Sequence, residues 1–211
     1  MSRFITVATC NLNQWALDWV SQSVSFWRYV LTKGQEGNTN RIIESIHKAK
    51  DAGARLRVGP ELEIPGYGCL DHFLEMDVYA NSFDMLERIL RDETCHNIIL
   101  DIGLPILHRN LRFNCRVLAL NGKILFIRPK LLLANDGNYR EMRYFTPWMR
   151  QQHIEDFYLP KNLAKLQGST MVPIGDCVLS TPDTTIGVET WYVNKVELQI
   201  LIDAASFWMI Y

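Results

Sequence analysis

A glutamate and a lysine each stand where an apolar strand of this sequence is expected to end. Glu61 follows the apolar stretch 56–58, in a segment rich in proline and glycine, which break regular structure. Lys130 follows the apolar stretch 124–127, directly after Pro129. Ligands of α/β enzymes bind beyond the carboxyl ends of parallel strands, so both positions are candidates for a site. A carboxylate can act as a general base and an ammonium can stabilise an oxyanion, so the pair could serve a nucleophile.

Each of these residues also has an ordinary structural interpretation. Glu61 could be a capping or solvated turn carboxylate, and Lys130 could be a strand-end lysine that reaches into water. Glu141, further along the chain, could orient Lys130, or it could form a surface ion pair with Arg140 or Arg143. From the residues alone these alternatives stay open.

The composition is that of an ordinary globular protein. The chain has 211 residues, of which 48% are hydrophobic and 21% charged, enough for one domain with a sizeable core. A net charge of −1 gives no electrostatic reason to bind nucleic acid or an anionic membrane. No apolar run approaches the roughly 18 residues that span a bilayer. Five cysteines without a Cys-x-x-Cys pair argue against a disulfide framework or a zinc site. We expect a cytoplasmic protein without a nucleic-acid, membrane or metal partner.

The apolar periodicity predicts an α/β protein with a mixed sheet. It predicts strands over 4–12, 55–58, 97–104, 113–120, 123–127, 172–179 and 185–188. Helical spacing predicts helices over 38–52 and around 83–90. The opening β-α-β order is typical of a parallel sheet, and Asn121-Gly122 is the strongest short signal for a hairpin. These elements would place Glu61 and Lys130 at strand ends.

Two segments do not fit this pattern. The connection 20–35, between the first strand and the first helix, is longer than such connections usually are and too apolar for a solvated loop. After Thr190 the chain ends in an apolar tail, 204–211, without turn residues.

Several motifs together resemble one family. They are VATCNLNQWALD (7–18), GPELE (59–63), IRPK (127–130) and LANDGNYRE (133–141). In these motifs the chain resembles the N-terminal glutaminase domain of the eukaryotic glutamine-dependent NAD synthetase family, within the nitrilase (carbon–nitrogen hydrolase) superfamily. Apart from 20–35, the resemblance covers residues 3–190.

The resemblance implies a fold, a reaction and site residues. The fold would be a four-layer α-β-β-α sandwich, C-terminally truncated here. A Glu-Lys-Cys triad would hydrolyse the side-chain amide of glutamine, with Glu61 as general base and Lys130 as the oxyanion-stabilising cation. Glu141 would support Lys130, and Tyr67 would line the glutamine pocket. The ammonia would pass to a synthetase domain, absent from this sequence, that uses ATP and Mg²⁺ to amidate nicotinic acid adenine dinucleotide. Family members would be homo-oligomers, and this chain itself would hold no cofactor.

The nucleophile is where the sequence departs from the family pattern. The family's cysteine should stand two residues after Glu189, where this chain has Trp191 followed by Tyr192. Cys177, in a predicted strand, is a poor substitute. We therefore expect this chain to be inactive. The alternative to an enzyme is a non-catalytic nitrilase-fold remnant or interaction module; a free-standing amidase is disfavoured because 135–141 match the synthetase branch.

Intron read-through would explain both segments that do not fit. The codons of Trp191-Tyr192-Val193 are TGG-TAY-GTN, which contain a good splice-donor sequence directly after the TG that begins a cysteine codon. The segment 20–35 can likewise begin with GT and end with CAG. This hypothesis divides the chain into a partial hydrolase domain over 1–190, with a foreign insert at 20–35, and an unrelated tail over 191–211.

Overall fold

The computed structural model describes residues 5–12, 14–18, 37–182 and 184–190, together with the backbone of 209–210. The predicted insert at 20–35 and Trp191 lie outside the described residues. In the part of the chain that is described, no helix is long and apolar enough to cross a membrane.

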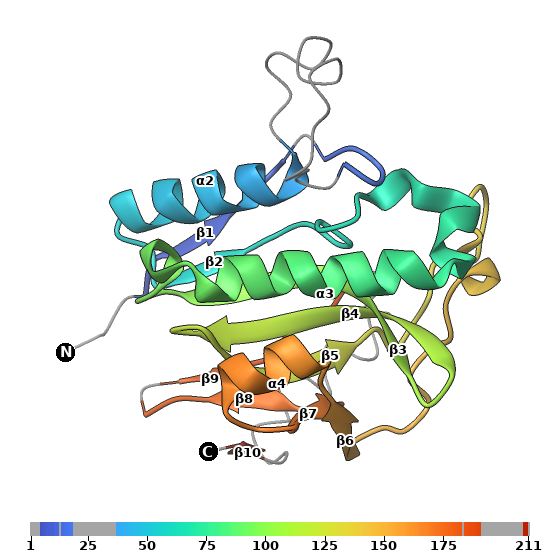
Figure 1. Cartoon of the computed structure of the whole chain (residues 1–211). Coiled ribbons are helices and arrows are strands. Elements are labelled where there is room, and N and C mark those ends of the chain that lie inside the picture. Colours follow the sequence, from blue (N-terminus) through green and yellow to red (C-terminus); the bar gives the residue numbers. More distant parts are fainter. Residues whose placement is uncertain (1–4, 13, 19–36, 183, 191–208, 211) are drawn as a thin grey trace, which may run out of the picture.

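A mixed sheet of seven strands forms the centre of the molecule (Figure 1), in the order β1-β2-β3-β4-β5-β7-β6. Its strands are β1 (Val7–Thr9), β2 (Leu56–Val58), β3 (Ile99–His108), β4 (Leu111–Leu120), β5 (Lys123–Pro129), β6 (Ile154–Tyr158) and β7 (Met171–Gly175). The first three strands run parallel, and β4 is antiparallel to both β3 and β5. The strands β2, β3 and β5 therefore end at the same edge of the sheet. The predicted mixed α/β sheet is confirmed.

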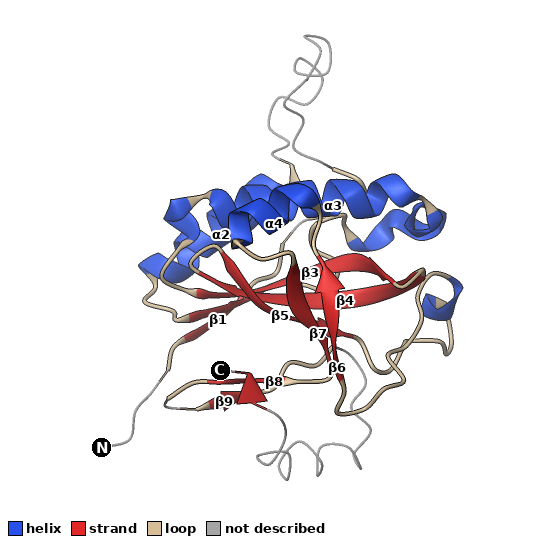
Figure 2. Cartoon of the chain, turned by 60° about the horizontal axis from the view of Figure 1, so that its bottom comes forward, coloured by secondary structure: helices blue, strands red, loops and turns tan. Residues whose placement is uncertain are grey.

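The sheet has helices on one face and a second, smaller sheet on the other (Figure 2). The helices are α2 (Asn38–Asp51), α3 (Met76–Arg91) and α4 (Lys161–Gln167). The small sheet has the order β10-β8-β9, with β8 (Val178–Ser180), β9 (Thr185–Ile186) and β10 (Met209–Ile210). Three short 3-10 helices complete the fold: η1 (Tyr67–Leu74), η2 (Glu93–Cys95) and η3 (Glu141–Arg143). The described residues thus form an α, a β and a β layer of the expected four-layer arrangement.

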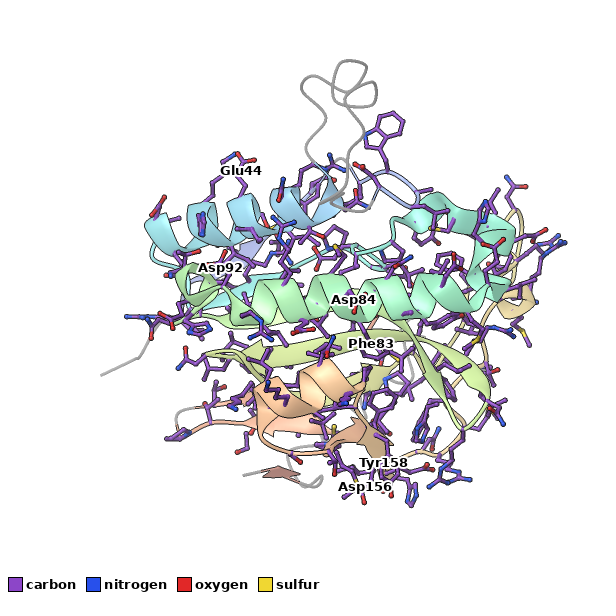
Figure 3. All side chains as sticks on the ribbon, viewed as in Figure 1. Glu44, Phe83, Asp84, Asp92, Asp156 and Tyr158 are labelled. Carbon is purple, nitrogen blue, oxygen red and sulfur yellow. The ribbon has the colours of Figure 1, made fainter. Side chains whose placement is uncertain are left out.

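Helix α2 shows why the helical layer lies on this face of the sheet. Ile42, Ile46 and Ala49 recur at helical spacing and are buried, because they form one apolar stripe that packs on the sheet. Glu44, on the opposite side of the helix, points away from the sheet (Figure 3). The helix ends at Asp51, before Gly53 at φ +75°, close to the predicted limit of 38–52.

One hairpin of the large sheet was predicted from its turn residues, and another was not. Asn121 and Gly122, between β4 and β5, have φ of +51° and +74°, as a two-residue type I′ turn requires, which confirms the predicted hairpin. Arg109 and Asn110 have the same left-handed conformation between β3 and β4. That hairpin was not predicted, since arginine is rare in such turns.

The later strands differ most from prediction. The single strand predicted over 172–179 is wrong: it divides into β7 and β8, which belong to different sheets. The break follows Gly175, whose φ of +152° is unfavourable for other residues. Neither β6 nor α4 was predicted. In β6, Phe157 packs against Phe83 of α3 with ring centroids 5.7 Å apart, and Tyr158 lies on the outer surface (Figure 3).

After a register shift between Ile124 and Phe126, strand β5 orients its side chains toward both layers in alternation. Ile127 belongs to the core beneath the helices, whereas Phe126 packs with Cys177 of the small-sheet side. Residues two apart in a strand share a face, so Lys130 extends the row of Phe126 rather than that of Ile127. The lysine therefore lies on the face of the large sheet that the small sheet partly covers.

Candidate active site

A buried lysine between two carboxylates forms the centre of the site. The Lys130 Nζ atom lies 2.7 Å from Glu61 Oε1 and 2.7 Å from Glu141 Oε2. Only 1% of the Lys130 side chain is exposed, against 13% of Glu61 and 8% of Glu141. So little water reaches these groups that the interaction between the ammonium and the carboxylates is much less screened than at the surface.

The sheet topology brings these groups together. Glu61 follows the end of β2, and Lys130 follows the end of β5, at the same edge. Because β4 runs in the opposite direction, Asn114 near its beginning lies at that edge as well. The Lys130 amide N–H donates to the Asn114 carbonyl at 2.8 Å, which fixes the lysine beside β4.

Asn114 was not singled out as a site residue from the sequence. Its side-chain amide donates to Glu141 Oε1 at 2.7 Å and also to Glu61 Oε1, and the residue is 2% exposed. It therefore holds both carboxylates at once. The signal that could have revealed it is a lone amide within the apolar strand Leu111–Leu120.

The structure decides between the two interpretations of Glu141. Its carboxylate accepts hydrogen bonds from Lys130, from Asn114 and from the Ala134 amide N–H at 2.8 Å. Arg143 instead pairs with Asp71 at 2.8 Å on the surface. The surface ion pair considered for Glu141 is therefore wrong, and the loop after β5 folds back so that Glu141 reaches the lysine.

Tyr67 stands at the rim of the same cluster. It begins η1 and is 51% exposed. Partial burial, followed by the negative charges of Glu61 and Glu141, raises the pKa of Tyr67 to about 12. The phenol is therefore a hydrogen-bond donor at neutral pH, beside the two carboxylates.

Two buried cysteines, Cys177 and Cys115, are poor candidates for an alternative nucleophile. Burial raises the pKa of the Cys177 thiol to about 12, and Cys177 packs with Leu118 and Phe126 between the sheets. Burial raises the pKa of Cys115 well above its ordinary value. Neither thiol can form a thiolate readily. Arg128 Nη2 binds Glu189 Oε2 at 3.1 Å, so the chain two residues before position 191 is held to the strand that precedes Lys130.

Comparison with known proteins identifies the family of the chain. The family model for carbon-nitrogen hydrolases matches residues 6–204. The chain belongs to the carbon-nitrogen hydrolase family.

Within this family, the chain is similar to glutamine-dependent NAD(+) synthetases. It is 57% identical to that of Saccharomyces cerevisiae over 190 residues, which are 90% of this chain and 24% of the yeast protein. It is 51% identical to that of Homo sapiens over 189 residues, which are 90% of this chain and 24% of the human protein. The crystal structure of a glutamine-dependent NAD(+) synthetase from Cytophaga hutchinsonii aligns with a TM-score of 0.70 at 30% identity, over 87% of this chain and 27% of that one. The carbon-nitrogen hydrolase chain thus spans about a quarter of the length of the relatives it matches.

Proposed function

We propose that this chain carries the acid–base half of a glutaminase site of the kind found in glutamine-dependent NAD(+) synthetases. The observation that supports this is the Lys130 ammonium, buried and held 2.7 Å from both Glu61 and Glu141. Two of its three N–H donors go to carboxylates, so one donor remains for an oxyanion. Glu61, the more exposed carboxylate of the two, is the one open to a substrate.

With a cysteine at position 191, each group would have a defined role. Glu61 would take the thiol proton, and the thiolate would attack the amide carbon of the glutamine side chain. Lys130 would stabilise the oxyanion that forms, while Glu141 and Asn114 hold the lysine in place. Glu61 would return the proton to the leaving nitrogen, which departs as ammonia. Water, activated by Glu61, would then hydrolyse the thioester to glutamate and restore the thiol.

In the full-length protein, the ammonia would serve an ATP- and Mg²⁺-dependent synthetase domain that forms NAD(+). Both cofactors would belong to that domain rather than to this chain. Tyr67, at the rim beside the carboxylates, would line the pocket that receives the glutamine side chain.

We further propose that the chain as it stands does not turn over, because Trp191 replaces the nucleophile. Loss of a covalent nucleophile typically costs about a million-fold in rate. This observation also favours the second candidate function, a nitrilase-fold remnant without catalysis.

Ammonia release from glutamine tests both proposals. We expect none from the unchanged chain, measurable release from Trp191→Cys, and none from Trp191→Cys combined with Glu61→Gln. Release by the unchanged chain that disappears in Glu61→Ala would refute the remnant. Release from Trp191→Cys that persists without Glu61 would refute the role of the carboxylate.

Sequencing the transcript tests the origin of residues 20–35 and 191. A spliced message that lacks both segments and restores a cysteine codon would support intron read-through. A single uninterrupted exon would exclude it.

A further inference from the structure

A second buried ion pair lies beneath the turn that carries Glu61. Arg57 and Glu63 are both 0% exposed and are joined by two hydrogen bonds, Nη1–Oε1 at 2.7 Å and Nη2–Oε2 at 2.8 Å. Ser45 of α2 accepts from Arg57 Nε and Nη2 at 3.1 and 2.7 Å, and the Gly103 amide donates to Glu63 at 3.3 Å. The proposed reaction uses none of these groups.

The turn between β2 and η1 is fixed at both ends on strand β3. The Gly59 amide donates to the Asp101 carbonyl at 3.0 Å, and the Ile64 amide donates to the Gly103 carbonyl at 3.2 Å. Between these two points the backbone of residues 60–62 lies close against Gly103 of β3, and the Glu61 side chain reaches Lys130.

Leu62 gives the two glutamates of this turn different directions. Residues two apart in an extended chain point to the same side. Here Glu61 reaches Lys130 and Glu63 reaches Arg57, because Leu62 between them has a φ of +49°. A leucine rarely adopts this left-handed conformation, which persists only when its surroundings impose it.

The packing around the turn leaves no space for adjustment. A Cβ atom at Gly59 would lie 1.9 Å from Glu63 Oε1 and 2.4 Å from Arg57 Nη1. A Cβ atom at Gly103 would lie 2.6 Å from both Leu62 N and the Pro60 carbonyl. The turn therefore rests directly on the ion pair and on the bare backbone of β3.

We propose that the Arg57–Glu63 ion pair is the positioning device of Glu61: it imposes the conformation of Leu62 and so aims the catalytic carboxylate at Lys130. A buried ion pair is a poor source of stability, since well-packed apolar residues often replace it without loss. A bidentate pair fixes direction as well as distance, which an apolar contact does not. The inference rests on the proposed function only in taking Glu61 as the base.

Chemical labelling of the unchanged chain tests this positioning without any turnover. Among the described lysines Lys130 alone is buried, with Glu61 on its more exposed side, so a displaced Glu61 would expose its amine. Trace acetylation by acetic anhydride would be followed at Lys130 by mass spectrometry. Alkylation of the buried Cys115 thiol on β4 by iodoacetamide would report global opening in the same samples.

The variants separate positioning from stability. In Glu63→Gln we expect Lys130 labelling to rise at least about tenfold relative to Cys115, a factor equivalent to about 1.4 kcal/mol. Ser45→Ala, which removes one hydroxyl from Arg57, should raise it less. Glu155→Gln removes another buried carboxylate, on the far edge strand β6, and should leave the ratio within about twofold.

Unchanged Lys130 labelling, or a parallel rise at Cys115, would overturn the proposal. If Glu63→Gln does not fold, Ser45→Ala decides: a rise at Lys130 without a rise at Cys115 supports the proposal, and unchanged Lys130 labelling overturns it.

Kinetics in the Trp191→Cys chain provide a separate result. There Glu63→Gln should lower kcat about tenfold or more with little change in KM, because the base is misdirected while the pocket remains. A Trp191→Cys chain that releases no ammonia would refute the glutaminase proposal, and the labelling ratio would still decide the positioning.

Discussion

Two buried charge clusters of the large sheet differ in the sign of the charge that is in excess. At Lys130 one cation lies between two carboxylates. At Glu155, on β6, one carboxylate faces two arginines, Arg109 at 3.0 Å and Arg150, and the His108 ring nitrogen at 2.9 Å. By number of charges alone, either cluster could be taken for a functional site.

The two clusters differ in how much water reaches the partners. Glu61 and Glu141 are nearly as buried as the lysine they hold, whereas the Arg109 and Arg150 side chains are 62% and 57% exposed. Water and salt screen exposed arginines, so they neutralise Glu155 without leaving a strong local field. Between these two clusters, the difference thus lies in the burial of the partners that carry a permanent charge, because His108 is the one partner of Glu155 among these three that is buried.

Removal of the central lysine should have the largest effect on stability. Lys130→Met leaves two buried carboxylates without their cation, and we expect the free energy of unfolding to fall by about 3–5 kcal/mol. Urea denaturation at pH 7 measures it. The matched control is Lys123→Met on the same strand, whose exposed ammonium binds two carbonyls at the end of α4. An equal loss in both variants would show that burial does not set the Lys130 cluster apart.

Asn114→Ala should have the next largest effect. The amide donates to Glu61 and Glu141, and its loss leaves Glu141 Oε1 without a donor, whereas Glu61 Oε1 keeps its bond from Lys130. We expect a loss of about 1–3 kcal/mol, also measured by urea denaturation. Asn162→Ala, at an exposed position on α4, serves as the control. A loss no greater than that of the control would mean that Asn114 does not hold the carboxylates.

Glu155→Gln should produce a pH-dependent effect of about 1–2 kcal/mol at pH 7. Burial alone would raise the pKa of Glu155, but the hydrogen bond from His108 and the charges of Arg109 and Arg150 outweigh it and lower the pKa below its ordinary value of 4.5. The stabilisation is therefore complete above the unfolded pKa and disappears as the pH falls through the folded one. Unfolding free energies of the two proteins should converge as the pH falls below the ordinary carboxyl pKa of 4.5. A difference that does not change with pH would contradict this.

Arg150→Ala should have the smallest effect. This arginine is largely exposed, so its bond to Glu155 should contribute about 0.2–1 kcal/mol in dilute buffer. The contribution should shrink further in 1 M salt, where the Debye length is about 3 Å. Urea denaturation at low and high salt checks both statements. A salt-independent loss as large as that of Lys130→Met would remove the contrast between the clusters.

Local patterns in the sequence were sufficient to predict several elements around the site. The helical spacing of α2, the apolar run of β3 and the Asn121-Gly122 turn each depend on neighbouring residues, and the structure confirms them. The same is true of the strand-end positions of Glu61 and Lys130, since a strand ends where proline or glycine interrupts it.

Prediction from local patterns failed for strands whose position depends on pairing with a distant part of the chain. The stretch 172–179 reads as one strand, but its two halves pair with different sheets. The edge strand β6 forms because β7 offers it a partner, and its own five residues carry too little periodicity to predict it.

The sequence by itself determined which residue types stand at the strand ends and that a tryptophan stands at position 191. Only the tertiary structure decided which groups meet: Glu61 with Lys130, Glu141 with the same lysine rather than with a surface arginine, and Glu63 with Arg57. The physical reason is that strand order and direction, fixed by the burial of apolar faces across the whole sheet, determine which strand ends become neighbours. A buried charge then pairs with whatever partner that topology places within hydrogen-bond distance.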